Sequence, residues 1–261
     1  MSERAVLAHR PLARPDGIEA VIFDMDGVIT DTASVHAAAW KELFDSFLAE
    51  RSRRTGEPFE AFDLEADYRP YVDGKPRYDG VRDFLRSRGI ELPEGDRSDS
   101  PGADTVCGLG NRKNQVFLQQ LETEGARPFA PAVALVRALK ADGAGVAVIS
   151  ASRNMNAVLD AAGLDALFDV RVDGVLAAEL GLPGKPAPAV FEEAARRLGI
   201  AAAHTAVVED AIAGVRAGRA GGFAIVVGVD RTRQAEALRE AGADIVVRDL
   251  GELWRPQEAG A

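Results

Sequence analysis

Short apolar runs separated by helical stretches dominate the second half of the chain. Residues Phe191, Ala194, Ala195 and Leu198 lie between two of these runs at the spacing of one helix face. An alternation of this kind predicts an α/β fold, with a parallel sheet covered by helices on both faces. The expected strands are residues 146–149, 206–208, 224–227 and 243–247.

One further apolar run, Ala20-Val21-Ile22, stands far from these near the beginning of the chain. A single strand cannot form a sheet, so we expect it to join the later strands. Residues 33–50 between them have the pattern of a helix, with an apolar face of Trp40, Phe44, Phe47 and Leu48. We therefore predict a core domain of residues 18–31 and 127–250, an inserted helical cap domain of residues 32–126, and an N-terminal tail of residues 1–17.

The inserted segment also contains stretches without a helical period. Turns are expected at 56–58 and 73–76, and residues 91–105 have the Asp, Ser, Gly and Pro content of an exposed loop. A domain inserted after the first strand lies over the carboxyl ends of the strands, where a lid is useful to an active site.

Composition restricts the partners of this chain. Among 261 residues, 47% are hydrophobic and 28% charged, as in ordinary globular proteins, and no run approaches the length of a membrane span. The net charge of −10 argues against nucleic acid or an anionic membrane as a partner. The single cysteine, Cys107, allows no intramolecular disulfide, and the tail has no apolar signal-peptide core, so we expect a cytoplasmic protein.

The strongest chemical signal directly follows the first strand, where Asp24 and Asp26 stand one residue apart. The carboxyl ends of parallel strands are where open α/β sheets bind ligands. One carboxylate can act there as a nucleophile and metal ligand while the other transfers a proton. The alternative is an ordinary Asp-Gly turn, a dipeptide that recurs several times in this chain.

Three more candidates occur at the ends of later strands. Ser150 can hold a phosphate with nearby backbone amides, or it can cap a helix. Lys185, between a glycine and a proline, can neutralise developing charge, or it is a solvated loop lysine. Glu209 and Asp210 suit a hard cation, although Asp210 is also in position to cap the next helix.

Together and in this order, these four motifs resemble those of the haloacid dehalogenase-like superfamily of phosphotransferases. The resemblance implies a doubly wound, Rossmann-like core with an inserted cap. Several further residues make the resemblance more specific, because they resemble those of the β-phosphoglucomutase subfamily. Those that resemble its substrate-binding residues are His36, Trp40, Gly74, Arg77, Lys113, Ser152, Arg153 and Asn154.

The subfamily implies a mechanism in which Asp24 carries the phosphoryl group and Asp26 acts as general acid and base. Ser150 and Lys185 would stabilise the transferring group. The implied cofactor is Mg²⁺, held by Asp24, the backbone carbonyl of Asp26 and Asp210, with Glu209 either as a further ligand or directly behind the ligands. The implied reaction interconverts β-glucose 1-phosphate and glucose 6-phosphate. Arg153 replaces a lysine of the subfamily, and residues 51–72 and 91–108 look longer than its fold needs.

Two other functions are consistent with the same sequence. A sugar-phosphate phosphatase of this fold, for example one acting on trehalose 6-phosphate, shares every core motif, and only the cap separates it from a mutase. A non-catalytic sugar-phosphate sensor is also possible on this fold, but it would not need Asp24, Asp26, Lys185 and Asp210 together. In each case the partner is a small sugar phosphate, and we expect a monomer.

Overall fold

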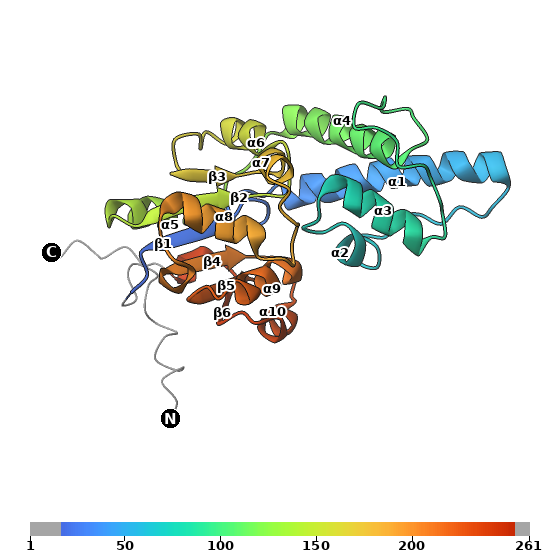
Figure 1. The fold of residues 1–261 in the computed structure, drawn as a ribbon. Helices are drawn as coiled ribbons and strands as arrows, with labels where there is room; N and C mark the ends of the chain where they lie inside the picture. Colours follow the sequence, from blue (N-terminus) through green and yellow to red (C-terminus); the bar gives the residue numbers. More distant parts are fainter. Residues whose placement is uncertain (1–16, 254–261) are drawn as a thin grey trace. The chain divides into compact units, whose positions relative to one another are not determined.

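The computed structural model describes residues 17–253 and divides the chain into two compact units (Figure 1). Among these residues, the core unit combines residues 17–31 with residues 127–253, and the inserted unit is Thr32–Ala126. Of the expected N-terminal tail, residues 1–16 lie outside the described residues. Each unit has buried hydrophobic clusters of its own.

The core unit is built on a six-stranded parallel sheet with the strand order β3-β2-β1-β4-β5-β6. This confirms the predicted α/β fold. The strands are β1 (Ala20–Asp24), β2 (Gly145–Ile149), β3 (Val170–Val172), β4 (Thr205–Glu209), β5 (Ile225–Val229) and β6 (Ile245–Val247). The short edge strand β3 was not predicted, because three residues with an arginine in the middle give no apolar run.

Helices cover both faces of this sheet. Ile22 of β1 packs in one cluster with Phe191 of α8, whereas its neighbours Val21 and Phe23 are equally buried and, by the two-residue period of a strand, face the other side. The core helices are α5 (Ala130–Ala141), α6 (Met155–Ala161), α7 (Gly174–Glu179), α8 (Ala189–Leu198), α9 (Ile212–Ala220) and α10 (Ala235–Ala241), with 3₁₀ turns at Ala202–His204 and Leu250–Glu252.

The order of the strands reverses beside β1. The chain continues from β1 to β2 and β3 on one side, and then crosses to β4, β5 and β6 on the other. Phe23 pairs with Val208, so the next residues, Asp24 and Glu209, end neighbouring strands side by side. A reversal of this kind is where open α/β sheets form their ligand sites.

The inserted unit is helical, as predicted. Its helices are α1 (Ala33–Thr55), α2 (Tyr68–Tyr71), α3 (Arg77–Ser87) and α4 (Val106–Glu124). Helix α1 runs beyond the predicted end at residue 50 and stops at Gly56, whose φ of 77° ends a helix without the strain that a side chain would add. Within residues 17–253, no helix combines the length and the apolar character that crossing a membrane requires.

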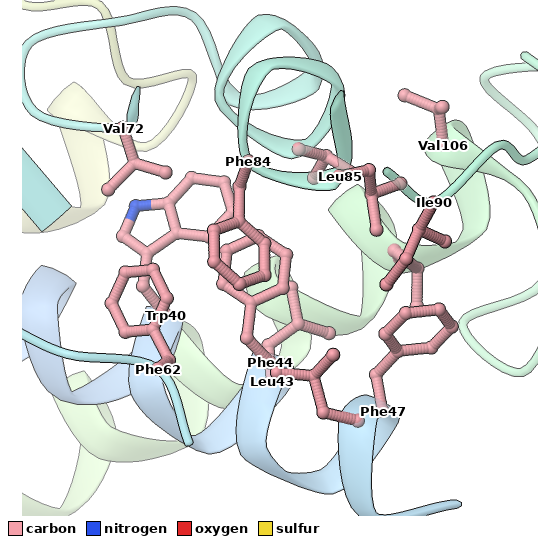
Figure 2. Packing of buried hydrophobic residues seen from close by; sticks show 13 residues of the cluster. Trp40, Leu43, Phe44, Phe47, Phe62, Val72, Phe84, Leu85, Ile90 and Val106 are labelled. Atoms are coloured by element: carbon pink, nitrogen blue, oxygen red, sulfur yellow. The ribbon is translucent and has the colours of Figure 1, made fainter. Parts of the chain in front are cut away.

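Aromatic rings form the centre of the inserted unit (Figure 2). The Phe44 ring centroid lies 4.0 Å from that of Phe84 and 5.1 Å from that of Phe62, and Trp40 stacks on Phe44 at 5.3 Å. Phe62 belongs to the non-helical stretch between α1 and α2. Its ring therefore anchors a segment that the sequence presents only as polar and irregular.

The backbone of the same segment is also held. The Phe62 amide donates to Asp45 Oδ1 at 2.7 Å, and its carbonyl accepts from Lys41 Nζ at 2.9 Å. The other long segment, residues 91–105, contains no helix or strand, in agreement with the predicted loop. It ends where the Thr105 hydroxyl accepts from the Gly108 amide and so caps α4.

Candidate active site

Four acidic or basic side chains converge at the point where the strand order reverses. Asp24 ends β1 and Glu209 ends β4, followed by Asp210. Carboxylate oxygens of these three residues lie within 4.8 Å of one another. Asp210 is not the residue that caps α9, because the N-cap position is Ala211. The helix-capping explanation of Asp210 therefore fails.

Lys185 lies among these carboxylates. Its ammonium donates to Asp24 Oδ1 at 2.5 Å and also to Glu209 Oε1, and its side chain is only 5% exposed. The interpretation of Lys185 as a solvated loop lysine is therefore wrong. Two backbone amides, those of Asp210 and Ala211, donate to the other Glu209 oxygen at 3.0 and 3.1 Å and fix this carboxylate in place.

Burial strongly influences the protonation of this cluster. It raises the pKa of the Asp24 carboxyl well above its usual value; the Lys185 ammonium opposes this rise, while Glu209 and Asp26 add to it. Burial alone lowers the pKa of Lys185, but Asp24 and Glu209 outweigh that effect and raise it, so the lysine stays charged.

The charges around Lys185 suit a divalent cation. When all three carboxylates are ionised, the one ammonium leaves two negative charges uncompensated in a largely buried place. Hard cations such as Mg²⁺ and Ca²⁺ prefer oxygen ligands of this type. A cation there would also lower the pKa of Asp24 and keep it ionised. The donor set therefore fits the metal that the resemblance implies.

Asp26 and Ser150 lie on adjoining turns of the same site. The Ser150 hydroxyl donates to Asp26 Oδ2 at 2.9 Å and accepts from the Ser152 amide at 3.0 Å. The N-cap of α6 is Asn154, so Ser150 is not a helix cap. Asp26 itself is partly exposed, whereas Asp24 is 6% exposed, and the two carboxylates thus have different surroundings.

Two glycines make room for the acidic side chains. A Cβ atom on Gly27 would lie 1.9 Å from Asp210 Oδ2, and Gly27 has a φ of 85° that a side chain would strain. A Cβ atom on Gly214 of α9 would lie 2.0 Å from the Glu209 carboxylate. Gly214 could not be found from the sequence, because a glycine in a helix gives no sign of which side chain lies against it.

Three of the predicted substrate-binding residues come together in the inserted unit. His36 Nδ1 and Lys113 Nζ are 2.6 Å apart, and Lys113 is 4% exposed. The Lys113 ammonium lies 5.2 Å from the ring centroid of Trp40 and 4.8 Å from that of Phe117, on which His36 stacks. Trp40, 4% exposed, is thus part of the packed interior of its unit and contacts the lysine through its ring.

Arg77 and Gly74 lie at the start of helix α3 and in the turn before it. Arg77 Nη2 donates to Asn114 Oδ1 at 2.7 Å, and Asn114 directly follows Lys113 in the chain. Gly74 has a φ of 67°, as the predicted turn requires. The inserted unit thus gathers a partly exposed arginine and a buried lysine in one region.

The remaining predicted residues, Ser152, Arg153 and Asn154, follow β2 in the core unit. The Ser152 hydroxyl accepts from the Asn154 amide at 3.1 Å and shapes the turn, and the Arg153 side chain is exposed. This turn is continuous with Ser150 and hence with the core site.

The sequence and the fold both match known proteins. The profile of the haloacid dehalogenase-like hydrolase family matches residues 18–222. The chain is 53% identical over 247 residues to the β-phosphoglucomutase of Mycobacterium bovis, covering 94% of both proteins. It is 42% identical over 130 residues to the trehalose-phosphate phosphatase of Mycobacterium leprae, but this match covers only 48% of the chain and 28% of that protein. The crystal structure of β-phosphoglucomutase from Clostridium difficile superposes with a TM-score of 0.69 at 25% identity, over 91% of this chain and 93% of that one.

A carboxylate cluster at the strand reversal, with a buried lysine bonded to two of its members, fits this family match. The chain belongs to the haloacid dehalogenase-like hydrolase family, and it is an enzyme of the phosphosugar mutase or phosphatase type. Within the family it groups with the β-phosphoglucomutases, because both the long sequence match and the superposed structure carry that name.

Proposed function

We propose that the protein interconverts β-D-glucose 1-phosphate and glucose 6-phosphate through an aspartyl phosphate on Asp24 and a glucose 1,6-bisphosphate intermediate. The observation that carries this proposal is the 53% identity to a β-phosphoglucomutase over almost the whole chain. That match extends through the inserted unit, which is the part that separates a mutase from a phosphatase of the same fold.

Asp24 is the proposed nucleophile. It ends a buried strand and is held by Lys185 in a place where water is scarce, so one carboxylate oxygen can attack phosphorus in line. Asp26 is the proposed general acid and base, because it is two residues away and partly exposed. It would protonate the leaving sugar oxygen and later take a proton from the attacking one.

Lys185 and Ser150 would stabilise the phosphoryl group during transfer. The lysine ammonium adjoins the attacking carboxylate, and the Ser150 hydroxyl lies next to backbone amides of its turn. Donors held in advance stabilise developing charge without reorganising. Ser152, Arg153 and Asn154 follow in the same turn, and we assign them to substrate binding, with Arg153 contributing a positive charge.

Mg²⁺ is the proposed metal, with Asp24, the Asp26 carbonyl, Glu209 and Asp210 as its protein ligands. When bound, it draws charge from the phosphoryl oxygens and favours attack by an anionic nucleophile. These carboxylates would hold the ion. Because Gly27 and Gly214 have no side chains, they leave room for the carboxylates of Asp210 and Glu209.

A mutase needs a second phosphate site, since its bisphosphate intermediate carries two phosphates. We assign this site to the inserted unit, with Arg77 as the main phosphate ligand and Gly74 in the turn before it. Lys113, His36 and Trp40 form a packed group beside Asn114, the partner of Arg77. We propose that His36 and Lys113 bind the substrate and that Trp40 supports them.

A sugar-phosphate phosphatase is the second candidate. The partial match to a trehalose-phosphate phosphatase supports it, since all the core residues would serve hydrolysis equally well. It requires water to reach the aspartyl phosphate, whereas a mutase must exclude water. The shorter extent of that match makes it the weaker alternative.

One incubation distinguishes the two. The protein is mixed with β-glucose 1-phosphate, Mg²⁺ and a trace of glucose 1,6-bisphosphate, and glucose 6-phosphate and inorganic phosphate are measured together. The mutase predicts glucose 6-phosphate with little free phosphate. Free phosphate without isomerisation would instead identify a phosphatase, and α-glucose 1-phosphate in a parallel tube tests the anomer.

We also propose that the enzyme is a cytoplasmic monomer with no nucleic-acid or membrane partner. The single cysteine supports the location, and the charge of −10 argues against a nucleic-acid or anionic-membrane partner. Sedimentation of the purified protein measures the oligomeric state, and fractionation of the source cells measures the location.

A further inference from the structure

Arg231 lies in the segment that joins β5 to α10 and contacts the turn that carries Asp26. Its Nε donates to the Gly27 carbonyl at 2.8 Å, and its Nη1 donates to the Arg248 carbonyl at 3.2 Å. Its guanidinium carbon lies 3.8 Å from the ring centroid of Phe129. The side chain is 20% exposed, so most of it is enclosed by these groups.

The Gly27 carbonyl belongs to the turn that carries Asp26. Gly27 contacts Asp210 so closely that a Cβ atom would overlap its carboxylate. The Gly27 amide donates to the Thr30 carbonyl at 2.8 Å and closes the turn. The Ile29 and Thr30 amides also close the turn, by donating to the Met25 carbonyl at 2.9 Å, and the Arg231 guanidinium adds a side-chain contact from a distant segment.

Phe129, whose ring lies against the Arg231 guanidinium, is tied to the same turn. Its amide donates to the Ile29 carbonyl at 2.9 Å. Gln234, three residues after Arg231, donates from Nε2 to the Asp210 carbonyl at 3.2 Å. The segment from Arg231 to Gln234 thus holds both the turn of Asp26 and the turn of Asp210.

We propose that Arg231 is a positioning residue for phosphoryl transfer, acting through the Gly27 carbonyl on the direction of the Asp26 side chain. The proposal rests on the function assigned above to Asp26. A planar guanidinium can stack on Phe129 and donate sideways to Gly27 at once, which a lysine ammonium cannot do. A displacement of about 1 Å in a catalytic group costs roughly 100-fold in rate, so this contact matters although Arg231 touches no reacting atom.

The test compares Arg231→Met and Arg231→Lys with a matched control, Arg219→Met. Like Arg231, Arg219 binds a backbone carbonyl: it donates two hydrogen bonds to that of Gly242. It also pairs with Asp244 at 2.5 Å, and it lies in α9 outside the proposed site. Two measurements are made for each variant: hydrogen exchange of the peptide spanning residues 24–30, and kcat and KM for β-glucose 1-phosphate in the presence of Mg²⁺ and glucose 1,6-bisphosphate.

For Arg231→Met we expect faster exchange in residues 24–30 and a kcat lower by roughly 10- to 100-fold, because transfer to and from a sugar oxygen needs Asp26. KM should change by less than about threefold, because the residues proposed to bind the sugar phosphate do not include Gly27. Arg231→Lys should recover part of the rate. Arg219→Met should leave exchange, kcat and KM unchanged even if it lowers the unfolding midpoint.

Wild-type exchange in residues 24–30 of Arg231→Met would overturn the proposal, as would an equal loss of rate in Arg219→Met. If the wild-type protein accepts no phosphoryl group from any donor, the proposed function fails, and the catalytic part of this proposal fails with it. The exchange comparison then still decides separately whether Arg231 holds the turn.

Discussion

At the scale of single residues, the two aspartates of the first motif differ through their surroundings. Asp24 is buried and bonded to Lys185, whereas Asp26 is partly exposed and accepts a hydrogen bond from Ser150. A carboxylate beside a fixed ammonium suits nucleophilic attack, and one with access to solvent can exchange protons. The environment therefore supports a division of roles between identical side chains.

Asp24→Asn should abolish phosphoryl transfer, because an amide cannot form the aspartyl phosphate. We expect turnover to fall by roughly 10⁴-fold or more, and no label from radioactive acetyl phosphate to remain on the protein. Asp142→Asn, at an exposed position after α5, is the control and should keep full activity. Clear turnover by Asp24→Asn in a clean preparation would exclude Asp24 as the nucleophile.

Arg77→Ala should separate the two proposed phosphate sites. Loss of a guanidinium that binds the second phosphate should lower mutase kcat/KM by roughly 100-fold, yet change Asp24 phosphorylation by acetyl phosphate by less than about threefold. Arg86→Ala is the matched control, since Arg86 lies on the same helix with 73% of its side chain exposed. Equal losses in both assays would mean that Arg77 is structural or serves the core site.

At the scale of elements, the long segment between α1 and α2 is ordered by one aromatic side chain and its backbone. Phe62 is 1% exposed and packs against Phe44 and Phe84, while Asp45 and Lys41 bind its amide and carbonyl. This segment thus adds to the interior of the inserted unit.

Phe62→Ala should remove this anchor. Truncation of a fully buried phenylalanine costs about 3–5 kcal/mol of unfolding free energy, from lost transfer energy and the cavity that remains. Phe59→Ala, three residues earlier and 50% exposed, should change the unfolding free energy by less than about 0.5 kcal/mol. Urea unfolding of both variants measures the difference, and equal small effects would mean that the segment is not anchored at Phe62.

Helix α8 contains an ion-pair group that should show in the acid dependence of stability. Glu193 accepts from Arg196 and Arg197 at 2.7 and 2.6 Å, and these bonds lower the pKa of its carboxyl from 4.5 to about 2. Because the folded-state pKa is the lower one, the stabilisation is complete above about pH 5 and is lost as the pH falls toward 2.

Glu193→Gln should therefore lower the unfolding free energy at pH 7 by at most about 1 kcal/mol, since both arginines are substantially exposed and screened. The gap between wild type and variant should narrow as the pH falls below 5 and close only near pH 2. Glu192→Gln, exposed on the same helix, is the control. A gap independent of pH would show that the effect arises from packing.

At the scale of the whole molecule, the protein is acidic overall, and it also gathers negative charge at the candidate active site. The net charge is −10, and the carboxylates of Asp24, Glu209 and Asp210 lie within 4.8 Å of one another. Lys185 balances only part of this charge. Binding of a divalent cation to the folded protein should therefore stabilise it markedly.

Mg²⁺ should raise the thermal midpoint of the protein. At 100 times the dissociation constant, the stabilisation is about 2.7 kcal/mol, which corresponds to a rise of roughly 5–10 °C in a chain of this size. Asp210→Asn should lose most of this rise, whereas Asp142→Asn should keep it. Thermal scans with Mg²⁺ and after chelation by EDTA give both values, and an equal rise in Asp210→Asn would exclude Asp210 as a ligand.

The sequence by itself determined the class of fold and the places where chemistry is expected. The strands at 146–149, 206–208 and 224–227, the first strand and the helices around them follow from periods of two and 3.6 residues, which are set by near neighbours in the chain. The candidate residues of the core site stand out in the sequence because each follows an apolar run or lies in a loop between two elements. They are Asp24, Asp26, Ser150, Lys185, Glu209 and Asp210. Their roles, and those of the substrate-binding residues, stay predictions.

Only the tertiary structure decided which side chains meet. Lys185 is 161 residues from Asp24 in the chain, and no local pattern shows that its ammonium is buried against that carboxylate. The same holds for Gly214 against Glu209, for Arg231 against Gly27, and for the edge strand β3, which is too short to show a period. Contacts of this kind depend on the order of the strands in the sheet, and that order is set by packing between distant segments.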